Sequence, residues 1–329
     1  MISRLFFGCI VFFILSSLSC AWGQANYHKS PVVANGTTRD TSLDHLPRET
    51  FIPFTRQGNL MLVEGSINGK KITMVFDTGA AGCLFSLEML KSLCIKIPAN
   101  LPTATVGGVG NKRQAQAWIM PANIKLGSIE RHQFPVYVNS NALNYPLLGV
   151  SFFQGFEYTI NTDASIIQFK RVSKDKSTAA TAAFMQELPA HLTSKTSITV
   201  DSSCHYIYTV PFAELNGAII VMVNIGGRDC PMILDTGTSV CLFSNEHLRE
   251  LGIAPHFTGK MLNAKGAVGF VKAPLCVFDE AQFGPIKDRL ICLVSDQALL
   301  PRPLLGQNFF GKWQLTIDHT NCVIKFTRK

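Results

Sequence analysis

Two aspartates occupy nearly the same stretch of sequence, 158 residues apart. Asp77 lies in MVFDTGAAGCLFS (residues 74–86) and Asp235 lies in MILDTGTSVCLFS (residues 232–244). Each follows an apolar run, ITMVF or PMIL, so each carboxylate is expected at the end of a buried strand. Asp-Thr-Gly alone is also typical of a simple turn. However, a buried charge is costly unless it is paired or functional, so the pattern favours chemistry.

If two similar units face each other about a twofold axis, the same loop from each unit meets at that axis. Asp77 and Asp235 would then lie side by side, share one proton and titrate as a coupled pair. One carboxylate would act as general base on a water while the protonated partner donates to a substrate carbonyl. The residues expected to brace this pair are Thr78, Gly79, Thr236 and Gly237. The threonines would hydrogen-bond across the axis, and the glycines would let the two backbones approach closely.

The duplication extends beyond the aspartates. Between residues 72–86 and 230–244, eight of fifteen positions are identical. A second pair of blocks, PLLGVSFFQGFEYTINTDASIIQFK (146–170) and PLLGQNFFGKWQLTIDHTNCVIKFT (303–327), follows at an offset of 157. Two separated blocks that keep register indicate a duplicated structural unit.

The elements around each aspartate are predicted to be strands. Runs such as KKITMVF, HQFPVYV and AIIVMVNIGG are rich in β-branched residues and end at Gly, Asn or Pro. Asn68-Gly69 and Gly226-Gly227 predict β-hairpins whose second strands deliver the aspartates. One short helix is expected after each loop, with Ser86 or Ser244 as its N-cap and, in the second copy, Gly252 at its end.

Asp-Thr-Gly after an apolar strand, followed some seventy residues later by LLG (147–149 and 304–306), resembles the retropepsins, the retroviral-type aspartic proteases. The block IKLGSIERHQFPVYV…PLLGVSFF is especially similar to bacterial retropepsin-like proteins. This resemblance implies an all-β, bilobal pair of closed β-barrel units, the acid-protease fold, related by a pseudo-twofold axis. It also implies that Asp77 and Asp235 are the catalytic pair, and that Gly149 and Gly306 lie in strands beneath the catalytic loops. Alanine stands at position 80 where the second copy has Thr238.

Members of this family carry a hairpin flap between the two motifs. ATVGGVGNKRQAQAW (104–118) and KMLNAKGAVGFVKA (260–273) occupy that position. The glycines expected in the flaps are Gly107, Gly108, Gly110, Gly266 and Gly269. A mobile loop without substrate contact is the alternative interpretation. Trp118 and Phe270, near these hairpins, are equally compatible with the core and with a substrate pocket.

The sequence predicts five segments. Residues 1–23 resemble a signal peptide, 24–50 form a loose N-terminal segment, 51–171 the first unit, 172–204 a linker, and 205–329 the second unit. Arg4, an apolar stretch and Ala21-Trp22-Gly23 give the order of a secretory signal. Retention as an anchor and lipidation at Cys20 remain alternatives. The mature protein is therefore expected in the periplasm or outside the cell.

Bulk composition excludes other classes. The formal net charge is +8, but no run of five like charges occurs, so no nucleic-acid partner is expected. His132, His247 and His319 are scattered and no C-x-x-C occurs, so neither a metal nor another cofactor is expected. Cys83 and Cys241 are expected to be small buried side chains behind the catalytic loops. Disulfides are left open among Cys204, Cys230, Cys276, Cys292 and Cys322.

The resulting hypothesis is an exported aspartic endopeptidase that acts on a peptide or protein. A catalytically weak peptide-binding module of the same fold is the runner-up, and a glycosidase is a third class. A glycosidase would need its carboxylates about 5 Å or more apart and would lack the symmetric repeat. A monomer that pairs its units within one chain is expected, with pairing swapped between chains as the alternative. A membrane tether is expected only if the N-terminal segment is retained or lipidated.

Overall fold

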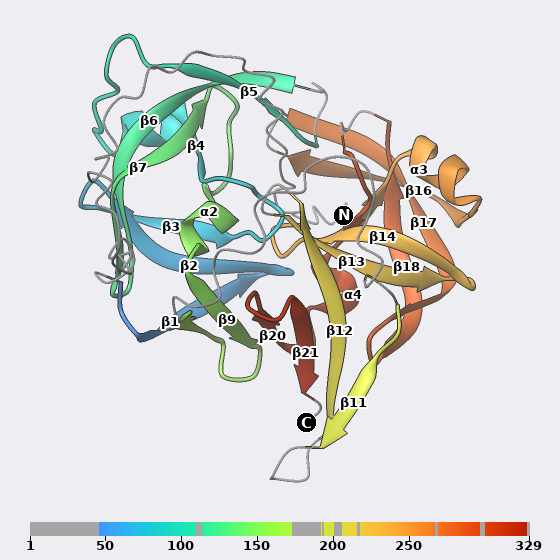
Figure 1. Ribbon diagram of the computed structural model, residues 1–329. Helices are drawn as coiled ribbons and strands as arrows, with labels where there is room; N and C mark the ends of the chain where they lie inside the picture. The colour runs from blue at the N-terminus through green and yellow to red at the C-terminus, as the bar shows by residue number, and fades with distance from the viewer. Residues whose placement is uncertain are drawn as a thin grey trace, which may run out of the picture.

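The computed structural model describes residues 46–109, 114–172, 192, 194–200, 206–215, 218–266, 269–296 and 300–327. The predicted signal peptide and Gly110 lie outside these residues. The described part is built mainly of strands, with short helices, and divides into two units of the same design (Figure 1). Within the described ranges, no helix combines the length and apolar character needed to cross a bilayer.

The first unit is drawn from blue to green in Figure 1. Its strands are β1 (Glu49–Gln57), β2 (Leu60–Ile67), β3 (Lys70–Phe76), β4 (Leu84–Ser86), β5 (Thr103–Gly107), β6 (Gln114–Leu126), β7 (Ile129–Asn139), β8 (Leu147–Leu148), β9 (Phe156–Asn161) and β10 (Ile166–Arg171). Its helices are α1 (Leu87–Ser92) and α2 (Val150–Phe153).

The second unit repeats this order and is drawn from yellow to red. Its strands are β11 (Ser197–Val200), β12 (Tyr206–Leu215), β13 (Ala218–Ile225), β14 (Arg228–Leu234), β15 (Cys241–Phe243), β16 (His256–Gly266), β17 (Gly269–Phe283), β18 (Ile286–Val294), β19 (Leu304–Leu305), β20 (Gln314–Asp318) and β21 (Val323–Thr327). Its helices are α3 (Asn245–Leu251) and α4 (Gln307–Phe310).

Each unit closes into a barrel. In the first unit, paired strands form the ring β2–β3–β8–β4–β7–β6 and return to β2. In the second unit, the corresponding ring is β13–β14–β19–β15–β18–β17 and back to β13. Closure leaves no exposed edge within the ring. The predicted all-β pair of closed barrels is confirmed.

A shared sheet joins the two barrels. Its strands follow the order β1–β10–β9–β20–β21–β12–β11, so that β9 of the first unit pairs with β20 of the second. At this central pair, the hydroxyls of Thr159 and Thr316 lie 3.1 Å apart. These two residues occupy equivalent positions in the repeat, at the offset of 157. A contact between equivalent residues marks the pseudo-twofold axis that the duplication predicts.

Two prolines lie where a strand passes from the shared sheet into its barrel. Strand β1 pairs with β10 up to Pro53 and with β2 from Phe54 onward. Strand β12 does the same at Pro211 and Phe212. Proline has no N–H to donate, so it suits the point where a ladder changes partner. Strand β1 starts before residue 51, so the boundary predicted there falls inside a strand. Strand β11 lies within residues 172–204, which the sequence predicts as a linker.

The turns and helix ends follow the local sequence signals. Asn68 and Gly69 have φ angles of 47° and 77°, the left-handed conformation that the predicted hairpin turn requires. The hydroxyl of Ser86 accepts a hydrogen bond from the Met89 amide at the start of α1. Ser244 caps α3 in the same way, and Gly252 ends α3 with a φ of 59°. The predicted caps are thus confirmed, and they fix the chain directly after each Asp-Thr-Gly loop.

Candidate active site

The two aspartates are the first residues after β3 and β14. The amide of Asp77 donates to the carbonyl of Leu148, at 3.1 Å. The amide of Asp235 donates to Leu305, at 3.0 Å. Each loop therefore rests on the short strand of its own LLG segment. Gly149 and Gly306, expected in those strands, come directly after them and begin α2 and α4.

The two loops approach so closely that only glycine fits after each threonine. A Cβ atom added at Gly79 would lie 2.5 Å from Cγ of Asp235. One added at Gly237 would lie 2.2 Å from Cγ of Asp77. Each carboxyl group thus lies against the glycine of the opposite loop. The sequence repeat brings together residues of the two units as predicted, although their catalytic role stays a prediction.

The threonines interlock the loops through four buried hydrogen bonds. The Thr78 amide donates to Oγ1 of Thr236 at 2.9 Å, and the Thr236 amide donates to Oγ1 of Thr78 at 3.0 Å. Each hydroxyl in turn donates across the axis, Thr78 to the carbonyl of Leu234 and Thr236 to that of Phe76, both at 2.8 Å. Because the amide and the hydroxyl of each threonine are hydrogen-bonded to the opposite unit, neither loop can shift without breaking these bonds.

Each carboxyl group is hydrogen-bonded at one oxygen and, within the described part of the chain, has no hydrogen-bond partner at the other. Oδ1 of Asp77 accepts from the amides of Gly79 and Ala80, both at 3.0 Å. Oδ1 of Asp235 accepts from the amide of Gly237 at 2.8 Å. Both Oδ2 atoms are buried, and neither receives a hydrogen bond from a donor group of the described residues. A proton held by the pair would supply the donor that both oxygens lack.

Both aspartates are fully buried, and this sets their protonation. Burial is the largest cause that raises the pKa of Asp77 well above its usual range, and repulsion from Asp235 adds to it. Burial likewise raises the pKa of Asp235, against the opposing effect of the backbone amides. Two interacting carboxyl groups release their protons in steps that belong to the pair. The pair therefore releases its protons at higher pH than isolated carboxyl groups do.

The two loops differ just after the shared glycine. Oγ1 of Thr238 lies 3.3 Å from the carbonyl of Val240, whereas Ala80 has no hydroxyl. The side-chain amide of Gln307 donates to the carbonyl of Thr236 at 3.2 Å. The equivalent position in the first unit is Val150, which has no side-chain donor. The second loop is consequently held by more side-chain hydrogen bonds than the first.

Two polar residues of the β1–β2 hairpin connect the units, and sequence reasoning missed both. Nδ2 of Asn59 donates to the carbonyl of Ser239 at 2.9 Å. Nη2 of Arg56 donates to the carbonyl of Gly311 at 2.9 Å. Glu214 replaces arginine at the position equivalent to Arg56. A search for charged positions that differ between the two copies would have singled out Arg56.

The predicted flap hairpins are β5–β6 and β16–β17, and they approach each other at Val109 and Gly266. A Cβ atom added at Gly266 would lie 2.0 Å from the carbonyl oxygen of Val109. Gly108 and Gly269 have positive φ angles of 151° and 123°. Gly107 ends β5. Gly266 therefore allows the close approach to Val109, while a role of these glycines in substrate contact stays a prediction.

The remaining residues considered from sequence lie outside the paired loops. Trp118 is partly buried against the barrel core, whereas Phe270 is 59% exposed. His247 completes the cap of α3: its Nδ1 accepts from the Ser244 amide, and its Nε2 lies 3.1 Å from the Leu300 carbonyl. Cys83 and Cys241 are buried as expected, and burial raises the pKa of both thiols to about 12.

Of the cysteines for which disulfides were left open, Cys204 lies outside the described residues. The described cysteines are free thiols, and no group of three or more metal-ligating side chains within the described residues is arranged to hold an ion.

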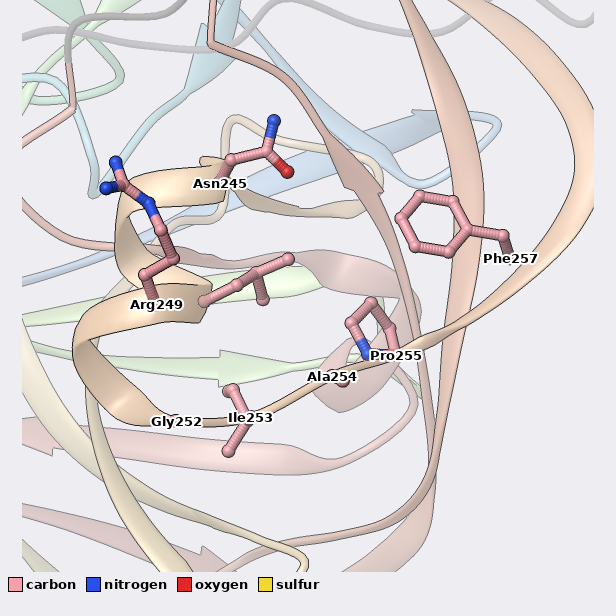
Figure 2. Close-up of a pocket in the computed structure, with 8 residues that line it drawn as sticks. Asn245, Arg249, Gly252, Ile253, Ala254, Pro255 and Phe257 are labelled. Atoms are coloured by element: carbon pink, nitrogen blue, oxygen red, sulfur yellow. The ribbon is translucent and has the colours of Figure 1, made fainter.

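A hollow of about 430 Å³ lies beside α3 (Figure 2). Its lining residues are Asn245, Leu248, Arg249, Gly252, Ile253, Ala254, Pro255 and Phe257. None of these belongs to the predicted site.

Comparison with known proteins identifies the repeated unit. Residues 63–155 and 221–312 each match the family described as "gag-polyprotein putative aspartyl protease", and together these stretches make up more than half of the chain. A curated relative, "Uncharacterized protein in cobV 5'region" from Sinorhizobium sp, is 28% identical over 102 residues, or 31% of this chain. The match covers 44% of that relative, less than half its length.

A solved structure, that of a retropepsin-like aspartic protease from Rickettsia conorii, is also similar. Its chain is 22% identical to this one, with a TM-score of 0.30. The match covers 37% of this chain and 90% of that one. The family match occurs once in each barrel and includes one Asp-Thr-Gly loop each time. The chain therefore belongs to the retropepsin-like aspartyl protease family and carries two of its units in one polypeptide.

Proposed function

We propose that this chain is an aspartic endopeptidase whose catalytic pair, Asp77 and Asp235, forms between the two units of one polypeptide. The observation that carries the proposal is the mutual contact of the loops, in which each carboxyl group lies against the glycine of the other. This arrangement brings the two carboxyl groups near enough to interact. Two interacting carboxyl groups hold one proton between them in the state that peptide-bond hydrolysis requires.

In this mechanism, the ionised carboxylate removes a proton from a water molecule. The water attacks the carbonyl carbon of the peptide, while the protonated carboxyl group donates to the carbonyl oxygen. The amides at positions 79, 80 and 237 hold the two Oδ1 atoms in place. The Oδ2 atoms are then the ones that face the reacting groups. Because the threonine network fixes both loops, little reorganisation is needed during the reaction.

The runner-up function is peptide binding without efficient turnover. The full burial of both aspartates favours it, since substrate can reach them only if the covering segments move. The intact loops favour hydrolysis, because binding alone does not need a proton-sharing pair. Turnover therefore decides between the two.

The test is hydrolysis of a peptide library between acidic and neutral pH by the full chain and by three variants. Asp77→Asn and Asp235→Asn should each reduce kcat/KM by about 10²-fold or more, the usual contribution of general acid–base catalysis. Asp288→Asn, which changes an exposed carboxylate on β18, is the matched control. A statine-type peptide should inhibit the wild type. Full activity of either active-site variant would exclude the shared pair, and binding without turnover would support the runner-up.

We further propose that the chain is exported and acts as a monomer. The order of charge, apolar stretch and small residues in the first 23 residues supports export. The hydrogen bonds between the loops of one polypeptide support the monomer. The mass of the mature protein from a producing cell should place its N-terminus near residue 24. A lipid mass retained on Cys20, and lost in Cys20→Ser, would support the tethered form instead. An active species of twice the monomer mass would support swapped units.

A further inference from the structure

The barrels carry apolar side chains on their outer as well as their inner faces, beside the catalytic loops. Side chains of a strand alternate between its two faces. On β14, Met232 and Leu234 belong to the cluster that fills the barrel, whereas Ile233 belongs to a separate cluster. We call this second cluster the second-unit wall. It is formed on the barrel by Ile220, Ile233, Val240, Leu242, Leu293 and Leu304.

The first unit has a corresponding outer surface, the first-unit wall. Its residues include Leu62, Val75, Leu84 and Leu147, which are equivalent to residues of the second-unit wall. It also includes Ala80, which is equivalent to Thr238 of the second catalytic loop. Each wall contains the side chain two residues before its aspartate, Val75 or Ile233. The walls therefore lie beside the two loops. A peptide that reaches the carboxyl groups must lie against these walls.

Leu192 belongs to the second-unit wall although it lies outside both barrels in the sequence. It is only 6% exposed, whereas the strand that follows, β11, is exposed along its whole length. Val109, which follows β5 in the first-unit flap hairpin, belongs to the same cluster. So does Ala264, which lies on β16 of the second-unit flap hairpin. An isolated leucine between the two units is thus buried among side chains of the barrel and of both flaps.

The two walls differ at the start of the second strand of each unit's first hairpin, β2 or β13. The first-unit wall contains Leu60, and the equivalent residue in the second-unit wall is Ala218. The exchange removes most of a side chain from the second wall. Among the described residues of the first-unit wall, none comes from outside its own barrel. The second wall therefore presents a smaller side chain at this position, and it is the wall that includes an aliphatic side chain from outside its barrel.

We propose that Leu192 occupies, from within the chain, an aliphatic side-chain pocket on the second-unit half of the cleft and competes there with substrate. Because the leucine is tethered, its effective concentration at the pocket is high without any binding partner. A peptide must displace it before an aliphatic residue can enter. The self-occupied pocket also agrees with the burial of both aspartates. The competition with substrate rests on the function proposed above, whereas the occupancy itself does not.

The occupancy is tested without hydrolysis. Ala213→Cys and Ala264→Cys each place a thiol at a buried alanine of the cluster, on different strands. Alkylation by iodoacetamide is followed peptide by peptide, with the exposed Cys94 as internal reference. Adding Leu192→Asn should accelerate alkylation of at least one introduced thiol about tenfold or more, with no change at Cys94. Unchanged rates at both positions would overturn the proposal.

The competition is tested by kinetics. Leu192→Asn should raise kcat/KM several-fold, mainly by lowering KM, since the pocket is then free. Leu46→Asn is the matched control, because Leu46 is also buried but belongs to the cluster that fills the barrels. If thermal melting shows that the asparagine variant is unfolded, Leu192→Ala takes its place. Equal or lower kcat/KM would overturn the competition. Absence of hydrolysis in every variant would refute the proposed function, while the alkylation result would still decide the occupancy.

Discussion

Thr236 is the residue at which the interlock between the units can be measured directly. Its hydroxyl accepts from the Thr78 amide and donates to the Phe76 carbonyl, and the side chain is fully buried. Thr236→Val keeps the shape but removes both hydrogen bonds. Each buried group left without its partner costs about 1–3 kcal/mol, so the variant should lose about 2–6 kcal/mol of unfolding free energy. This is a large share of the roughly 5–15 kcal/mol that is typical of folded proteins.

The assay is urea denaturation, followed by tryptophan fluorescence, of three variants and the wild type. Thr236→Ser keeps the hydroxyl and loses one methyl group, so it should cost only about 1 kcal/mol. Thr73→Val removes a hydroxyl on β3 that bonds the exposed Glu64 side chain, and should change stability by about 0.5 kcal/mol or less. The reasoning is refuted if Thr236→Val costs no more than Thr73→Val, or if serine at 236 is as damaging as valine.

Further outcomes follow from the same geometry. Gly237→Ala should abolish peptidase activity, because its Cβ would lie 2.2 Å from Cγ of a buried carboxyl group; retained wild-type kcat/KM would contradict this. Asp235→Asn should be more stable than the wild type at pH 7, by about 1 kcal/mol or more, with the difference vanishing near pH 3. The sign follows from the raised pKa values: the folded pair binds more protons than the unfolded chain, so wild-type stability falls as pH rises from about 4 through the folded pKa values. The measurement is the melting temperature of the wild type and of Asp235→Asn between about pH 3 and pH 7. His247→Gln should reduce the stability that is lost on acidification below about pH 6.5, because burial lowers the pKa of His247 and the neutral ring is needed in the cap, whereas glutamine caps without titrating. An unchanged pH dependence of melting would exclude a role for this histidine.

The features predicted correctly from sequence are those with local or repeated signals. Asn68-Gly69 determines its turn by its own conformational preferences, and Ser244 caps α3 by its own hydroxyl. The proximity of Asp77 and Asp235 follows from symmetry, because equivalent loops meet at a twofold axis. In each case, the deciding interaction lies within a few residues or is implied by the duplication.

The features that sequence reasoning missed depend on residues that are not repeated. Asn59 reaches Ser239 only because the two barrels are docked, and no local pattern in the β1–β2 turn specifies its partner. The burial of Leu192 depends on side chains of the second barrel and of both flap hairpins, which no local pattern around residue 192 specifies. The contact between Gly266 and Val109 likewise depends on how far two hairpins extend. These interactions are set by tertiary placement, which hydrophobic periodicity does not encode.

Duplication within one chain allows the two halves of a symmetric site to diverge separately. At the carboxyl pair they have stayed alike, because both threonines and both glycines are needed for the reciprocal contact. Away from the pair the two halves differ. Gln307 beneath the second loop is equivalent to Val150 in the first unit, and Ala218 in the second-unit wall is equivalent to Leu60 in the first. A peptide has a direction, so a cleft with two unlike walls distinguishes the two ways in which a peptide can lie across it. A substitution in one wall should therefore alter selectivity on one side of the scissile bond, and the equivalent substitution in the other wall should alter it on the other side. In a site built from two identical chains, any substitution changes both walls at once.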